Sequence, residues 1–126
     1  MAKKVDNSVL DAALNEIKTN CTRMVVCSAE PANYTAANTG GANNLGDVTM
    51  INGDFTVSDG DTSGRKVAVA SKSGVNVDVT GTATHVALLD VTNTLLLYVT
   101  TCTSQALTSG NTITFPAWDI EIADPT

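Results

Sequence analysis

Residues that carry most enzymatic and nucleic-acid chemistry are scarce in this sequence. Its 126 residues include one histidine, one tryptophan and three cysteines, and aromatic residues make up 4% of the chain. Seven basic residues stand against 13 acidic ones, which gives a net charge of −6. Nucleic-acid binding needs a basic surface that releases phosphate counterions, or aromatic rings on which bases stack. We therefore expect no nucleic-acid partner.

Long hydrophobic runs are also missing. The most apolar stretch, residues 85–99, is interrupted by Asp90 and by the polar residues 92–94. It is far shorter than the roughly 20 apolar residues of a membrane-spanning helix. Lys3 and Lys4 are followed by polar residues, whereas a secretory signal would continue into an apolar segment. We expect a soluble protein without membrane contact that stays where it is made unless something exports it.

The three cysteines fit no metal or redox pattern. Cys21 and Cys27 are separated by five residues and Cys102 lies far from both, which matches neither zinc-site nor redox-motif spacing. An odd number of cysteines in a chain without a signal peptide indicates small buried hydrophobic residues in a reducing compartment. We expect no cofactor.

Hydroxyl and amide side chains are abundant instead, with 19 threonines and 11 asparagines. Threonine suits the solvent face of a strand, and asparagine suits turns. A chain of this mass buries about two-thirds of its surface on folding, which is enough for a core without disulfides or metal. Residues 1–126 therefore predict a single β-rich domain.

One segment predicts a helix, and the rest predicts strands and turns. Residues 7–19, after an N-terminal arm of residues 1–6, repeat apolar side chains at helical spacing, and either Asp6 or Ser8 can cap them. Residues 32–46 are rich in asparagine and glycine and lack a period, which predicts a flexible loop. The expected strands are 23–27, 48–51, 54–58, 66–71, 75–80, 83–89, 95–101 and 112–122, the last bent at Pro116. The prediction is a mainly β protein, an antiparallel β-sandwich or barrel of about seven to eight strands with one N-terminal α-helix.

Two of the expected strands contain segments, residues 85–89 and 95–99, that are apolar on both faces, so both faces need cover. A second sheet can cover one face, and either the N-terminal helix or a neighbouring subunit must cover the other. The N-terminal lysines are either a solubilising terminus or the basic end of an arm that docks on an acidic partner. The interface candidates are Lys3, Lys4, Val86, Leu88, Leu96 and Tyr98.

The sharpest local motif is DGDTSG at residues 59–64. Asp59, Asp61 and Ser63 occupy the first, third and fifth positions of a calcium loop, with glycine at the sixth. Ala70 stands where a bidentate glutamate is required, so the motif is incomplete. A tight turn between strands is the simpler interpretation, and we expect no metal beyond this weak calcium candidate.

Candidate catalytic groups are isolated. His85, the only histidine, has no nucleophile motif around it. Asp119 and Glu121 point to the same side of a strand, but a glycosidase also needs a cleft and aromatic sugar platforms. We therefore expect no catalytic residues and no enzymatic activity.

Six short stretches are informative in combination: VLDAALN (9–15), CSAEP (27–31), DGDTSGRK (59–66), GTATHVAL (81–88), VTTC (99–102) and AWDIEIADP (117–125). Together they span nearly the whole chain, and they resemble small virion proteins of tailed bacteriophages, in particular head decoration or cement proteins. The resemblance implies a non-enzymatic β-rich protein that binds the outside of an expanded capsid, often as a symmetric oligomer. Such a protein reinforces contacts between coat subunits.

The resulting expectation is a capsid decoration protein of the virion, made in the host cytoplasm. Its partners would be the major capsid protein of a tailed phage and further copies of this chain, in a homo-oligomer. One alternative is another virion component, such as a head-fibre or tail protein. A second is a carbohydrate- or surface-binding β-sandwich module, which would need exposed aromatics in a groove or a complete calcium loop.

Overall fold

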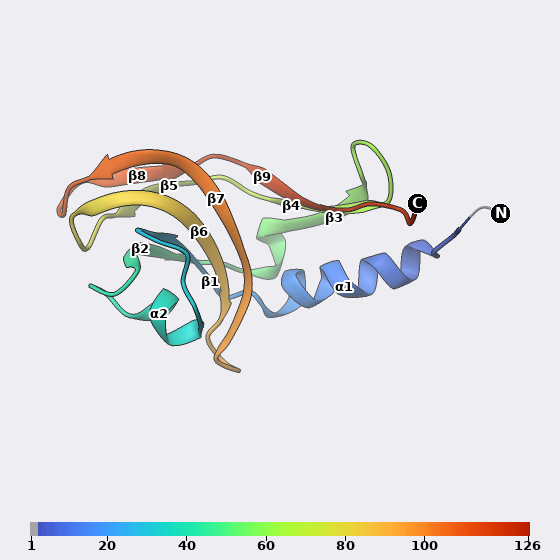
Figure 1. Ribbon diagram of the computed structural model, residues 1–126, viewed down its shortest axis with the longest axis horizontal. Coiled ribbons are helices and arrows are strands. Elements are labelled where there is room, and N and C mark those ends of the chain that lie inside the picture. The colour runs from blue at the N-terminus through green and yellow to red at the C-terminus, as the bar shows by residue number, and fades with distance from the viewer. Residues whose placement is uncertain (1–2) are drawn as a thin grey trace. The chain divides into compact units, whose positions relative to one another are not determined.

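Strands dominate the computed structural model, which describes residues 3–126 (Figure 1). A mainly β protein with an N-terminal helix is therefore confirmed, although nine strands form and a second short α-helix accompanies the first. The elements are α1 (Asn7–Asn20), β1 (Arg23–Cys27), α2 (Tyr34–Asn38), β2 (Asn44–Thr49), the 3₁₀ helix η1 (Asn52–Asp54), β3 (Phe55–Asp59), β4 (Arg65–Val69), β5 (Lys72–Asn76), β6 (Gly81–Asp90), β7 (Leu95–Leu107), β8 (Thr112–Phe115) and β9 (Trp118–Ile122).

All the strand pairs are antiparallel and form three sheets. The largest has the order β2-β1-β6-β7, the second β3-β4-β9, and the third pairs β5 with β8. The chain forms two compact units, each built from separated segments. Unit 1 contains residues 3–20, 51–71 and 116–126, and unit 2 contains residues 21–50 and 72–115.

In unit 1, helix α1 packs on the sheet β3-β4-β9 and runs beside it in Figure 1. Leu10, Leu14 and Ile17 recur at helical spacing and form the buried stripe of the helix. Of the two predicted N-cap candidates, Asp6 is the one that caps the helix. Its carboxylate accepts hydrogen bonds from the backbone nitrogen and the hydroxyl of Ser8. These bonds lower the pKa of Asp6.

The sheet of unit 1 has two chemically different faces. Val67 and Val69 of β4 are buried, and their register partners include Phe55 of β3 and Ile120 of β9, which are also buried. The alternate positions carry polar and small side chains. Period-two alternation therefore gives one apolar face and one polar face.

In unit 2, helix α2 covers part of one face of the four-stranded sheet. Ala37 is fully buried there with Val25, Cys27, Ala87 and Leu89. The sequence predicted that a second sheet would cover one face of the apolar segments 85–89 and 95–99. The N-terminal helix or a neighbouring subunit was expected to cover the other face. Within unit 2, a helix from the segment that was expected to be a loop covers part of this face.

The prediction of a loop over residues 32–46 is therefore wrong for both α2 and the beginning of β2. Asn33 caps α2 by accepting from the backbone nitrogen of Ala36, so an asparagine that suggested a turn starts a helix. Gly46 lies within β2 and is buried. A Cβ at this glycine would come within 2.6 Å of the carbonyl oxygen of Asn76, so glycine permits a close backbone approach.

Several strand boundaries differ from the predicted ones. The predicted strand over 112–122 is divided into β8 and β9 around Pro116, as the expected bend indicated. β5 lies three to four residues earlier than expected and includes Gly74, whose φ is positive. β7 extends six residues beyond its predicted end at residue 101.

Neither helix in the described part of the chain has the length and hydrophobicity needed to cross a bilayer.

The packing of α1 predicts that two of its apolar residues contribute very differently to the free energy of unfolding. Leu14 is fully buried, whereas Val9 is 59% exposed. We expect Leu14→Ala to lower the free energy of unfolding by about 3 kcal/mol, through lost burial and a residual cavity. We expect Val9→Ala to change it by less than about 0.5 kcal/mol. Urea unfolding followed by circular dichroism measures both, and equal losses would contradict this assignment of the buried face.

Candidate functional site

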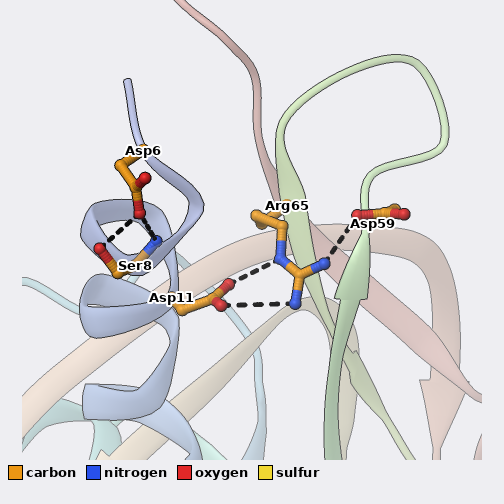
Figure 2. A network of polar contacts seen from close by, with 5 residues as sticks. All are labelled: Asp6, Ser8, Asp11, Asp59 and Arg65. Carbon is orange, nitrogen blue, oxygen red and sulfur yellow. Dashed lines mark hydrogen bonds and ion pairs between the residues drawn. The ribbon is translucent and has the colours of Figure 1, made fainter. Parts of the chain in front are cut away.

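Arg65 connects helix α1 to the β3–β4 hairpin of unit 1. Its Nε donates to Oδ1 of Asp11 at 2.7 Å, and its Nη2 donates to Oδ2 of the same carboxylate at 3.4 Å. On its other side, Nη1 donates to Oδ1 of Asp59 at 2.7 Å (Figure 2). The planar guanidinium is suited to such two-sided binding, and the two carboxylates raise the pKa of Arg65. Arg65 therefore bridges residues that are far apart in sequence.

Glu121 on β9 holds the loop that joins β3 to β4. Its Oε1 accepts from the backbone nitrogens of Thr62 and Ser63 at 3.1 and 3.2 Å, and its Oε2 accepts from Asp61 at 3.2 Å. Successive backbone N–H groups thus form a cradle around one carboxylate. The bonds from Ser63 and then Thr62 are the main causes that lower the pKa of Glu121. The loop is organised by a side chain from a distant strand.

Two glycines give the loop the shape that Glu121 binds. A Cβ at Gly60 would lie 2.1 Å from the carbonyl oxygen of Ser63 and 2.7 Å from Oε1 of Glu121. Gly64 has φ +68°, and a Cβ there would lie 1.9 Å from the carbonyl oxygen of Ile122. Any larger residue would force the backbone apart at these two positions.

Lys66 occupies the polar face of the same sheet. Its Nζ donates to Asp61 at 2.6 Å and to Asp119 at 3.4 Å. Lys66 lies directly opposite Glu121 in the β4–β9 register, so both side chains project from one face. The contact with Asp61 is the main cause that raises the pKa of Lys66. As predicted, Asp119 and Glu121 lie on the same side of β9. Asp119 accepts from Lys66, and Glu121 accepts from the backbone of the loop.

The three calcium candidates all have other partners. Asp59 binds Arg65 and Asp61 binds Lys66, while the hydroxyl of Ser63 accepts from the backbone nitrogen of Asp124 at 3.2 Å. Within residues 3–126, no group of three or more acidic, histidine or cysteine side chains is placed to hold a metal ion. We therefore propose no calcium site. Sequence reasoning missed Glu121 as the organiser of the loop, because no local pattern connects residues about 60 positions apart.

The six interface candidates fall into three groups. Lys3 and Lys4 are exposed, and Nζ of Lys3 donates to the backbone oxygen of Thr126 at 2.8 Å. Val86 and Leu88 are buried, with exposures of 9% and 0%, so they are core residues rather than contact residues. Leu96 and Tyr98 on β7 are partly exposed.

The first half of β7 keeps part of its apolar surface exposed. Leu95 is 46% exposed, and residues 96–99 are partly exposed. A shallow groove next to this surface is lined by Leu95 and Leu96 together with residues at the beginning of α2, among them Asn33 and Tyr34. The strand that the sequence assigned to an interface therefore keeps part of its apolar surface exposed.

His85 and the cysteines lie in a sheet rather than in a reactive cluster. Cys27 is directly opposite His85 in the β1–β6 register, and Nδ1 of His85 is 2.8 Å from the hydroxyl of Thr84. Burial, with a smaller contribution from Cys102, raises the pKa of Cys27 to about 11. Cys21 and Cys27 are buried and Cys102 is partly buried, as small hydrophobic residues would be.

No family model, curated protein or solved structure matches this chain. A functional assignment therefore has to come from the residues of the chain itself. The two surfaces that support one are the polar network of unit 1 and the β7 strand of unit 2.

The Glu121 cradle predicts a specific pH dependence of stability. The pKa of Glu121 is lower in the folded state than its ordinary value of 4.5, so the unfolded state binds more protons between these two values. The contribution of the cradle is complete above about pH 4.5 and is lost as the pH falls through the folded-state pKa. We expect Glu121→Gln to be less stable than wild type at pH 7, with the difference shrinking on acidification.

Urea unfolding at a series of pH values between 7 and 3 measures this difference. Glu16→Gln is the matched control, because Glu16 is an exposed carboxylate on α1 that makes none of these bonds. A constant difference between Glu121→Gln and wild type across the whole series would contradict the role of the ionised carboxylate.

Proposed function

We propose that this protein is a structural component of a tailed-phage virion, and specifically a capsid decoration or cement protein. It would be made in the host cytoplasm, bind the major capsid protein on the outside of the head and reinforce contacts between coat subunits. The resemblance of six stretches to such proteins supports this proposal. An arrangement of the antiparallel sheets as a sandwich or barrel belongs to the same proposal.

The observation that carries the proposal is the convergence of three of these stretches in unit 1. Residues 9–15 supply Asp11, residues 59–66 supply the loop and Arg65, and residues 117–125 supply Glu121. The bonds from Arg65 to Asp11 and from the loop to Glu121 join these separate segments. Short matches that are scattered along the sequence are therefore brought into contact in one unit of the fold, as residues that share a role would be.

The physical character of this surface suits docking on a protein lattice. The side chains of Asp59 and Asp61 are 86% and 64% exposed, so the loop presents negative charge while its backbone is held by Glu121. A preordered loop loses little conformational freedom on binding. We propose that it contacts a basic patch of the coat protein, with individually weak contacts multiplied over the symmetric lattice.

Co-sedimentation with undecorated heads, assembled from the major capsid protein of the same genome, tests this function. We expect the wild-type protein to pellet with heads at micromolar concentration and to be released by added salt. Asp61→Asn should bind more weakly because the loop loses an exposed charge. Glu16→Gln removes one charge from α1 and should bind like wild type.

Absence of the wild-type protein from the pellet would overturn the decoration function. Equal binding by Asp61→Asn and wild type would overturn the loop as the contact surface.

A further inference from the structure

β7 differs from every other edge strand in the described part of the chain. It is 13 residues long, and its sequence LLLYVTTCTSQAL contains no charged residue, proline or glycine. Its ladder partner is β6, alongside which it runs in Figure 1, and within residues 3–126 no strand pairs with its other side. About half of its backbone N–H and C=O groups therefore face outward along an edge about 40 Å long.

The remaining edges carry features that prevent unwanted pairing. β2 has six residues and contains Asp47. β3, β5 and β9 have five residues each and contain Asp59, Lys72 and Asp119 respectively. β8 has four residues and is followed by Pro116. Short length, charge and proline are among the means by which proteins block edge-to-edge pairing, and β7 has none of these three. Its ladder with β6 shifts register at two places, between Ala83 and His85 and between Leu88 and Leu89, and the paired stretches between and beyond these shifts remain regular.

We propose that β7 pairs antiparallel with β7 of a second copy of this chain, so that two four-stranded sheets join into one continuous sheet across a twofold axis. The inference goes beyond head binding and does not depend on it. A twofold axis uses the same edge of both copies and leaves no β7 edge open, so the assembly is a closed dimer.

Charge explains why a second copy fits this edge. The chain has a net charge of −6, so two copies repel each other over most of their surfaces. Residues 95–107 carry no charge, which leaves this edge without like-charge pairs across the axis. Leu95 is 46% exposed and Leu97 and Val99 are partly exposed, so pairing would also bury apolar surface.

Size-exclusion chromatography with light scattering tests the dimer directly. We expect wild type to elute with twice the monomer mass of 13.0 kDa at micromolar concentration. Thr101 is exposed at the midpoint of β7. Lysine there, in Thr101→Lys, places like charges near each other across the axis and should weaken the dimer by at least about tenfold.

Thr56→Lys is the matched control, because Thr56 is an exposed threonine on the short edge strand β3 and the substitution adds the same charge. It should remain dimeric. If Thr101→Lys fails to fold by circular dichroism, Gln105→Lys, at another exposed position of β7, takes its place. Amide hydrogen exchange provides a second measurement, in which residues 95–107 of wild type become more protected as protein concentration rises.

A wild-type protein that stays monomeric at high micromolar concentration would overturn the proposal. So would a dimer that survives both β7 substitutions, or one without concentration-dependent protection of residues 95–107. If wild type is monomeric but Thr101→Lys loses head binding, the β7 edge serves the capsid instead of a second copy. A dimer that fails to bind heads would overturn the decoration function and leave the β7 pairing intact.

Discussion

The carboxylate of Glu121 is the acceptor on which the polar surface of unit 1 depends. Three consecutive backbone N–H groups of the β3–β4 loop point at it, so the path of the loop follows from where β9 places this side chain. The loop in turn holds Asp61, which binds Lys66, and follows Asp59, which binds Arg65. Arg65 also binds Asp11, which ties helix α1 to the sheet. One acceptor thus organises charges contributed by three segments.

Backbone hydrogen bonding imposes a comparable constraint on unit 2. A strand in the middle of a sheet satisfies its donors and acceptors on both sides, whereas an edge strand satisfies half of them. Most edges here are short and carry a charge or end at a proline, and water can solvate them without inviting another chain. β7 is long, uncharged and partly apolar. In physical terms, the molecule presents one charged, preordered surface and one neutral edge, and these are suited to different partners.

Local patterns predicted the elements with strong periodicity. Helix α1 follows from Leu10, Leu14 and Ile17, and β1 has the predicted bounds because its β-branched run is followed by a turn signal. Helix α2 was missed because five residues do not establish a helical period, and Asn33 resembles a turn residue as much as a cap. The end of β7 was missed because TTCTSQ is polar on both faces, and its strand conformation comes from pairing with β6.

The sequence by itself determined the β-rich class, the position of the N-terminal helix, the neutral hydroxyl-rich composition and the apolar character of residues 95–99. These properties depend on residue type and on spacing over a few positions. Only the tertiary structure decided that Glu121 binds the backbone of the 59–64 loop, that Val86 and Leu88 are core residues, and that β7 lies at an edge. Each of these depends on which distant strand lies alongside, and that is decided by the packing and hydrogen bonding of the whole chain.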